Sequence, residues 1–310
     1  YLAIYPALAA GAARALARRG PGAGFALTFA ACWIVAEWLR SWVFTGYAWN
    51  PLAMVLLGPI DRPGLAALSP LLGTYALSGV AVLIGGGLAL LAAARRWLPA
   101  AAAAALLVAG MYWPAPAAEP GTLRVTIAQP FVRQAALNDP REYENTFRML
   151  ARLSLAQTAD AGTPRIVLWP ESGMADYLRE GYPQRYYDAT TALGSPAYAR
   201  RRLGNVVGEG SLLLTGAVDL AIGADESGTI RALGARNAVT AVSAQGAIIG
   251  GYAKAHLVPG GEYLPLRPLL EPLGLSRLVA GSIDFLPGPG PQTLDLGQFG
   301  KVSPQVCFEI

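Results

Sequence analysis

The sequence predicts two parts, a bundle of transmembrane α-helices over residues 1–118 and a soluble α/β domain over residues 119–310. The first half contains long apolar segments in series, and its few ionisable side chains cluster mostly between them. From Glu119 onward, short apolar runs alternate with polar segments, which is typical of a soluble α/β protein. The chain of 310 residues is only 14% charged, against roughly 25% in a typical soluble domain, and this deficit falls mainly in the first half.

Four apolar segments are candidate membrane helices, because a span requires about 20 mostly apolar residues. We expect spans at 22–44 and 72–94, a shorter one at 98–113, and the end of an earlier one at 1–13. Their serial arrangement favours membrane helices over the alternative, buried helices of a soluble core. Glu37 and Arg40 lie three residues apart on one helical face and could form a pair. Prolines interrupt residues 51–70, which we expect to enter the membrane surface rather than cross it.

The positions of the arginines predict the orientation in the membrane. One loop contains Arg14, Arg18 and Arg19, and another contains Arg95 and Arg96; both are expected to be cytoplasmic. Counting spans forward, the soluble domain lies outside the cytoplasm, which in a bacterium is the periplasm. A group of tryptophans near one end of the 22–44 segment is expected to form an interfacial belt or, alternatively, one wall of a lipid-binding cleft: Trp33, Trp38, Trp42 and Trp49.

The soluble half begins after a proline linker and has the pattern of a sheet with helices. The linker prolines are Pro114, Pro116 and Pro120. We expect a helix at 141–161 and strands at 123–129, 166–169, 212–219, 237–243, 247–252 and 302–308. Gly246 suits a hairpin turn, and Pro304 makes the last strand an edge or a bulge. Residues 172–211, rich in tyrosine and arginine, are predicted to be a long irregular segment that either faces lipid headgroups or is simply solvated.

Charge and cysteine content argue against nucleic-acid binding and against a disulfide. The net charge is +4, and no basic run is long enough to indicate nucleic-acid binding. Cys32 and Cys307 belong to different halves, so we expect two free thiols rather than a disulfide. We expect neither a cofactor nor a metal ion. Because Tyr1 replaces a start methionine and the chain stops just past Cys307, we expect a fragment cut at both ends.

Glu171, Lys254 and Cys307 together suit covalent acyl transfer through a thioester. A thiol with a pKa of about 8.5 is mostly protonated at neutral pH, so a base, here Glu171, must take its proton. Attack on an ester carbonyl creates an oxyanion, which the Lys254 ammonium and a backbone N–H beside Cys307 could stabilise. The thioester divides one difficult step into two easier ones. Each residue alone is weak evidence, since such residues are more often surface charges or core thiols.

Their sequence contexts are more specific. The segments LWPES, YAKAHLVPGGEYLPL and QVCFE resemble the nitrilase (carbon–nitrogen hydrolase) superfamily, whose sites use Glu, Lys and Cys in this order. More narrowly, the chain is similar to the apolipoprotein N-acyltransferase family over nearly its whole length. In the first half, the similarity includes YPAL at 5–8, AEWLRSWVFTGYAWNPL at 36–52 and SPLLGTYALS at 69–78.

This resemblance implies a fold, a reaction and a location. The fold would be a helical bundle in the bacterial inner membrane carrying a periplasmic, nitrilase-like αββα sandwich, here lacking its C-terminal part. A phospholipid would donate its acyl chain to Cys307, with Glu171 as base and Lys254 on the oxyanion. The acceptor would be the α-amine of the diacylglyceryl-cysteine that begins an apolipoprotein.

The resemblance also implies supporting residues. Glu262 matches a second family glutamate and is expected to orient Lys254 or the base, and Glu309 matches the acidic residue near the nucleophile. Phe308 stands where the family usually has tyrosine, so a hydroxyl contact is missing, and Gly260 stands in place of a phenylalanine. His256 is interpreted as structural, because Glu171 already fills the role of base.

Two other functions stay open from the residues alone. A membrane-tethered amidase or nitrilase would pass the acyl group to water through the same thioester. A helix bundle with a degenerate domain would be a non-enzymatic scaffold. The helices and the TGYAWNP segment favour the transferase over the amidase, and the presence of all three chemical residues disfavours the scaffold.

Overall fold

The computed structural model describes residues 2–17, 20, 22–43, 46–114, 119, 121–137, 139–155, 164–274, 283–307 and 309. The chain divides into two compact units, Tyr1–Glu119 and Pro120–Ile310, which are described separately. Several residues used in the predictions lie outside the described set: Arg18, Arg19, Phe44, Pro116, Pro120, Phe308 and the end of the predicted helix at 156–161.

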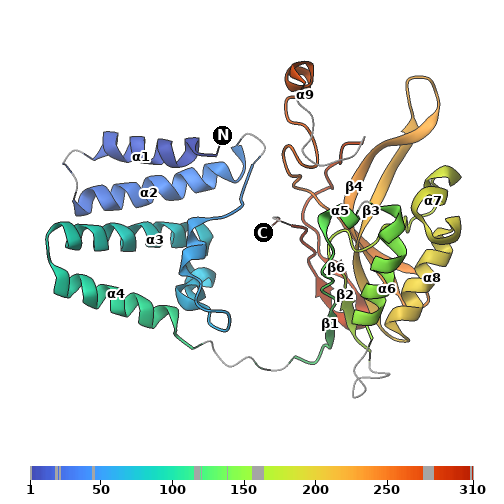
Figure 1. Ribbon diagram of the computed structural model, residues 1–310, viewed down its shortest axis with the longest axis horizontal. Coiled ribbons are helices and arrows are strands. Elements are labelled where there is room, and N and C mark those ends of the chain that lie inside the picture. Colours follow the sequence, from blue (N-terminus) through green and yellow to red (C-terminus); the bar gives the residue numbers. More distant parts are fainter. Residues whose placement is uncertain are drawn as a thin grey trace. The chain divides into compact units, whose positions relative to one another are not determined.

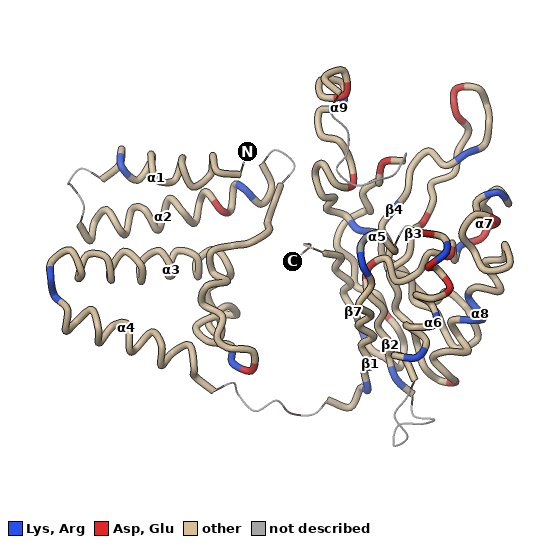
Figure 2. The backbone as a smooth tube through the Cα atoms, viewed as in Figure 1, with Lys and Arg blue, Asp and Glu red and all other residues tan. Residues whose placement is uncertain are grey.

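The first unit is built from apolar α-helices. These are α1 (Ile4–Leu16), α2 (Ala23–Arg40), α3 (Ser69–Ala93) and α4 (Trp97–Met111), and successive helices pack side by side (Figure 1). Two described helical stretches, α2 and residues 64–93, are long and apolar enough to cross a membrane; α4 is apolar but shorter. Figure 2 shows that α3 and α4 carry almost no charge except at the turn between them, where Arg95 and Arg96 lie. The predicted apolar helices are therefore confirmed.

Small residues let α2 and α3 approach closely. A side chain at Gly79 of α3 would collide with Ile34 of α2, and one at Gly86 would press on Ala26. Outward-facing positions of α3 and α4 are apolar, with Leu71, Leu98 and Leu106 exposed. Such exposed apolar surface suits a lipid environment, where helices associate through small residues rather than through hydrophobic burial.

Glu37 fixes the connection that follows α2. It is only 4% exposed, and its Oε1 accepts hydrogen bonds from Trp33 Nε1–H (3.1 Å) and the backbone N–H of Leu52 (2.8 Å). Arg40 Nη2 lies 4.0 Å from the same oxygen, so the predicted pair is confirmed. Leu52 begins the short 3₁₀ helix η2 (Leu52–Leu56), and a second one, η3 (Gly64–Leu68), leads into α3. Residues 51–68 are thus compact turns anchored on α2, and α3 begins at Ser69.

The second unit is a mixed five-stranded sheet. Its strands are β1 (Val125–Ile127), β2 (Ile166–Leu168), β3 (Leu212–Ala224), β4 (Ile230–Ser243) and β5 (Ile248–Ala253), in the order β1-β2-β3-β4-β5. The first two pairings are parallel and the last two antiparallel. Gly246, at φ +80°, forms the predicted turn between β4 and β5, and its N–H donates to Ser243 O.

Successive side chains along each strand point to opposite faces of the sheet, and both faces are apolar. On one face, Val167, Leu213 and Val242 pack beneath Leu150 of α6 (Tyr143–Leu153) and Leu203 of α8 (Pro196–Val207). The opposite face is covered by a small two-stranded ladder, β6 (Leu294–Asp295) with β7 (Lys301–Val302). Apolar side chains of this sheet face form one cluster with a residue that follows β6: Ile166, Leu212, Leu214, Ala241 and Leu296. Helices therefore cover one face and β6–β7 the other (Figure 1).

The prediction that residues 172–211 are irregular is wrong. They contain α7 (Gln184–Thr190), the 3₁₀ turn η6 (Ala192–Gly194) and α8. The start of α8 follows ordinary helix chemistry, because the Ser195 side chain accepts the Tyr198 N–H and Pro196 stands in the first turn. The frequent tyrosines obscured this signal. Further short elements are α5 (Gln134–Leu137), η4 (Pro140–Glu142), α9 (Arg267–Leu270), η7 (Glu271–Leu273) and η8 (Gly297–Phe299).

The prediction of a strand at 302–308 is also wrong. The β7 strand ends at Val302, described residues 303–306 form no ladder, and Cys307 lies in a turn. Pro304 has no N–H to donate, which prevents regular pairing beyond this point. Other boundaries differ by a few residues, and β3 and β4 extend farther toward their shared hairpin than predicted.

Candidate active site

Glu171 follows the carboxyl end of β2. The N–H of Trp169 donates to Leu214 O, so the chain continues beside β3 for one residue beyond the end of β2. A Cβ at Gly216 would lie 2.6 Å from Pro170 O and 2.7 Å from Glu171 Cα, so only glycine permits this close approach. Ser172 then adopts φ +55°, and the Gly173 N–H donates to Pro170 O. The resulting tight turn presents Glu171 with an exposed side chain.

Lys254 follows the end of β5 directly. Its backbone N–H donates to Asn237 O (2.8 Å), and its carbonyl accepts from the Gly288 N–H (2.8 Å). The side chain is only 1% exposed, and its Nζ lies 2.9 Å from Glu262 Oε2. Burying an ammonium is costly unless it is paired, and Glu262 supplies such a pair for Lys254.

Glu262 is itself held in a fixed position. Its Oε2 also accepts the Val258 N–H (2.8 Å), and its own N–H donates to Val258 O (2.9 Å). Its other oxygen, Oε1, accepts from Asn237 Nδ2 (3.0 Å). The turn of residues 258–262 therefore folds around its own glutamate, and both carboxylate oxygens are engaged.

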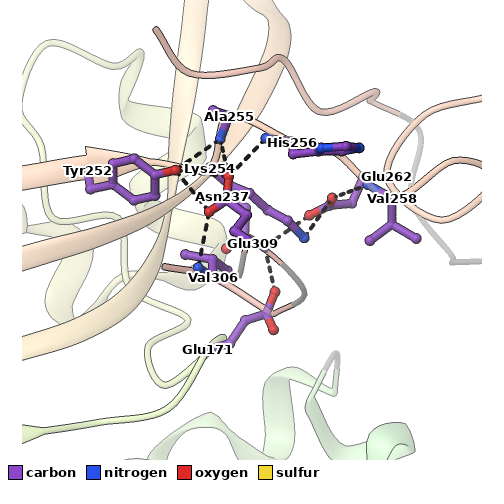
Figure 3. Close-up of polar contacts among 10 residues, drawn as sticks. All are labelled: Glu171, Asn237, Tyr252, Lys254, Ala255, His256, Val258, Glu262, Val306 and Glu309. Carbon is purple, nitrogen blue, oxygen red and sulfur yellow. Dashed lines mark hydrogen bonds and ion pairs between the residues drawn. The ribbon is translucent and has the colours of Figure 1, made fainter. Parts of the chain in front are cut away.

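Asn237 joins this pair to Glu171. Its Nδ2 donates to Glu171 Oε1 (2.6 Å) as well as to Glu262 Oε1. Figure 3 shows these side chains converging from β4, from the turn after β2, and from the segments that follow β5. Asn237 was not predicted as a site residue from the sequence. The available signal was one amide at the start of the run NAVTAV in a predicted strand, since a polar group that is buried requires partners.

Glu309 organises the neighbourhood of Cys307. Its Oε1 accepts the N–H groups of Ala255 (2.7 Å) and His256 (2.9 Å), and its Oε2 accepts the Val306 N–H (3.1 Å). The Tyr252 hydroxyl lies 2.9 Å from both oxygens. Burial and the bond to Glu309 raise the pKa of Tyr252 to about 12, so it remains a neutral donor.

Cys307 lies inside this turn, between Val306 and Glu309. It is exposed and adopts φ +60°, a left-handed conformation that is uncommon for a residue with a Cβ. Such a conformation at a sharp turn projects a side chain outward, as in the nucleophile elbows of hydrolases. The convergence of its sulfur with Glu171 and Lys254 stays a prediction, and Phe308 lies outside the described residues.

The assembled groups suit proton transfer and oxyanion stabilisation. An exposed carboxylate, Glu171, and a buried, paired ammonium, Lys254, are connected through the Asn237 amide and the Glu262 carboxylate by two hydrogen bonds and one ion pair. Among the described residues, no three His, Cys, Asp or Glu side chains gather as metal ligands. The described groups provide acid–base and electrostatic chemistry directly.

Known proteins that are similar to this chain share one description. Residues 1–87 match the family described as apolipoprotein N-acyltransferase N-terminal domain. The chain is 33% identical over 325 residues to the apolipoprotein N-acyltransferase of Brucella suis biovar 1, covering 100% of this chain and 56% of that protein. The corresponding figures for the Allorhizobium ampelinum protein are 30% over 316 residues, 100% and 55%, and for the Rhizobium meliloti protein 31% over 322 residues, 99% and 55%.

These similarities run through both units, and the chain spans about half the length of the curated relatives it matches. The matched stretch includes the apolar helices as well as the sheet domain that carries Glu171, Lys254 and Cys307. Over its whole length, the chain is similar to apolipoprotein N-acyltransferases.

Proposed function

We propose that this protein transfers an acyl chain from a phospholipid to the N-terminal amine of a diacylglyceryl-cysteine apolipoprotein, through a thioester on Cys307. The observation that carries the proposal is the connected series Glu171–Asn237–Glu262–Lys254 in a chain that is similar to apolipoprotein N-acyltransferases. It holds a carboxylate and an ammonium in one network, as a base and an oxyanion partner require.

In the first half-reaction, the Cys307 sulfur attacks the ester carbonyl carbon of the phospholipid while Glu171 takes the thiol proton. The negative charge that develops on the carbonyl oxygen is stabilised by the Lys254 ammonium, which Glu262 holds 2.9 Å from its carboxylate. The carbon–oxygen bond to the glycerol then breaks. The leaving alkoxide receives the proton from Glu171 and departs as a lysophospholipid.

In the second half-reaction, the α-amine of the apolipoprotein attacks the thioester carbonyl carbon. Glu171 accepts a proton from the amine, Lys254 again faces the oxyanion, and the carbon–sulfur bond breaks. The thiolate recovers its proton, leaving an amide on the lipoprotein and a free thiol on the protein. Each half-reaction uses the same groups, which is the pattern of ping-pong catalysis.

The proposed architecture fits this reaction. We propose that residues 1–118 lie in the bacterial inner membrane and that residues 119–310 form part of a nitrilase-like αββα sandwich in the periplasm. Helices α6 and α8 on one face of the sheet, and β6–β7 on the other, correspond to one helix layer, one sheet and the start of a second sheet. Apolar helices would bring this domain to its lipid substrate.

Mass spectrometry of the full-length protein tests the proposal. After incubation with phospholipid, we expect an acyl adduct on Cys307 that disappears when a diacylglyceryl lipopeptide with a free amine is added, with N-acyl lipopeptide as the product. Cys307→Ala should abolish both adduct and product, whereas Cys32→Ala, which removes the other thiol, should retain both. N-acylation by Cys307→Ala would refute the thioester mechanism. Adduct loss at the same rate without lipopeptide would instead favour the amidase.

A further inference from the structure

The Glu309 carboxylate links two segments that are distant in the sequence. From the end of β5 it accepts the Tyr252 hydroxyl and the N–H groups of Ala255 and His256. From the C-terminal turn it accepts the Val306 N–H. Figure 3 shows the carboxylate between these two sets of donors. Ala255 follows Lys254 and Val306 precedes Cys307, so one carboxylate connects the neighbours of the proposed oxyanion partner to those of the proposed nucleophile.

The Tyr252 hydroxyl is placed for this linkage. Tyr252 is 4% exposed, its oxygen lies 2.9 Å from each oxygen of Glu309, and the same oxygen accepts the Ala255 N–H at 3.3 Å. A phenylalanine could fill the same volume, so packing alone does not explain a buried hydroxyl here. The hydroxyl supplies the side-chain donor to Glu309, which otherwise accepts the three backbone N–H groups of Ala255, His256 and Val306.

The turn that contains Cys307 requires such support. Its φ of +60° lies in the left-handed region, which persists at a residue with a Cβ only where the surroundings hold it. The surroundings here include the hydrogen bonds of Glu309, whose N–H also donates to Val306 O at 3.4 Å and closes the turn weakly. Loss of the Tyr252 donor would loosen the carboxylate that anchors this turn to the segment after β5.

We propose that Tyr252 is a positioning residue for the Cys307 thiol, acting through Glu309. Its hydroxyl fixes the Glu309 carboxylate against residues 255–256 and thereby sets the position of the Cys307 turn relative to Lys254. This role rests on the proposed thioester function and adds a residue that takes no part in proton transfer or acyl transfer itself.

The test uses the full-length protein in phospholipid nanodiscs. We expect Tyr252→Phe to slow formation of the Cys307 acyl adduct by about tenfold, while the KM for the lipopeptide amine stays within about twofold. Alkylation of Cys307 by iodoacetamide, which needs no oxyanion partner, should stay within about twofold of wild type. Tyr198→Phe, which removes the hydroxyl of a partly exposed tyrosine on α8, is the matched control and should match wild type in all three measurements.

A double-mutant cycle distinguishes action through Glu309 from other effects. If Tyr252 acts through Glu309, Tyr252→Phe should cause no further loss in a Glu309→Gln background. Multiplicative losses, or an adduct rate for Tyr252→Phe equal to wild type, would overturn the proposal. If Tyr252→Phe fails to fold, Glu309→Gln alone must show slowed adduct formation with unchanged alkylation, and a normal adduct rate there would also overturn it. Absence of any adduct in wild type would refute the proposed function instead.

Discussion

The positions of the Glu171 and Glu262 carboxylates depend on the side-chain amide of Asn237. One nitrogen donates to Glu171 and to Glu262, so it bridges the proposed base and the partner of Lys254. Without this amide, the Glu171 and Glu262 carboxylates would each lose a hydrogen-bond donor that lies between them. Their repulsion would move Glu171 away from the thiol it is proposed to deprotonate.

We therefore predict that Asn237→Ala slows acyl-adduct formation on Cys307 by about 10- to 100-fold. An unsatisfied polar partner costs about 1–3 kcal/mol, and about 1.4 kcal/mol corresponds to a tenfold change in rate. Asn237→Asp, nearly identical in shape, should be at least as slow because it adds a third carboxylate. Rapid-quench mass spectrometry measures the rate. Asn205→Ala, an exposed amide on α8, is the control, and equal rates for it and Asn237→Ala would contradict the bridging role.

Tyr252 provides a prediction about pH. Its pKa is raised to about 12 by burial and by the negative Glu309, above the ordinary value of about 10. A group whose pKa is higher in the folded state stabilises the fold fully below the unfolded pKa, and this contribution is lost as pH rises through the folded value. We expect the free energy of unfolding to fall between about pH 10 and 12, and to fall less in Tyr252→Phe. Denaturant titrations across this range measure it, and identical pH slopes would contradict it.

Single glycines determine how closely elements approach the site. Gly216 of β3 lies against Pro170 and Glu171, where a Cβ would be within 2.8 Å of three backbone atoms. Backbone atoms cannot move aside as a flexible side chain can. Any substitution here must displace the segment that carries Glu171, although Gly216 itself touches no substrate.

We predict that Gly216→Ala lowers acyl-adduct formation by about tenfold or more and destabilises the domain by about 1–3 kcal/mol, as overpacking commonly does. Gly250→Ala is the matched control, since a Cβ there meets its nearest atoms at 3.6 Å, an ordinary contact. Chemical denaturation and adduct kinetics measure both variants. A Gly216→Ala protein with wild-type kinetics would show that the Glu171 turn tolerates displacement.

The sequence was most informative where periodicity is strong. The apolar helices and strands β2 to β5 were predicted, because apolar runs and alternation report burial directly, although β3 and β4 extend well beyond their predicted bounds toward their shared hairpin. Helices α7 and α8 were missed, since their tyrosines and arginines weaken the apolar pattern that a short amphipathic helix shows. The end of β7 was misplaced because hydrophobicity around Pro304 and Val306 resembles a strand, whereas the missing N–H prevents one.

At the site, residue types could be predicted but not the connections between them. Glu171, Lys254 and Glu262 were singled out from their segments. Glu262 pairs with Lys254, and its orienting role stays a prediction. Asn237 and Tyr252 were missed, because their importance depends on contacts between β4, β5 and two distant turns. Such contacts arise from tertiary packing, which local sequence patterns do not encode.

At the scale of the molecule, the proposed function depends on which side of the membrane the unit with Glu171 and Lys254 occupies. Arginines at the α1–α2 and α3–α4 connections favour a cytoplasmic position for both loops. If the α3–α4 loop is cytoplasmic and the second unit is periplasmic, the chain must cross the membrane between them. The helix in this stretch is α4, which has only 15 residues. A helix of this length can span by local thinning of the bilayer, at a modest cost.

We predict that intact cells label the catalytic unit but not the α3–α4 loop with a membrane-impermeant maleimide. In a protein lacking Cys32 and Cys307, Ser227→Cys on the exposed β3–β4 turn should be labelled at once, and Ala94→Cys at the end of α3 only after the membrane is permeabilised. Labelling in permeabilised cells confirms that both thiols react. Labelling of both positions in intact cells would mean that α4 does not cross, and labelling of Ala94→Cys alone would reverse the orientation. The second result would place Glu171 and Lys254 in the cytoplasm, away from the periplasmic lipid surface that the proposed acyl transfer requires, whereas the first would contradict only the crossing by α4.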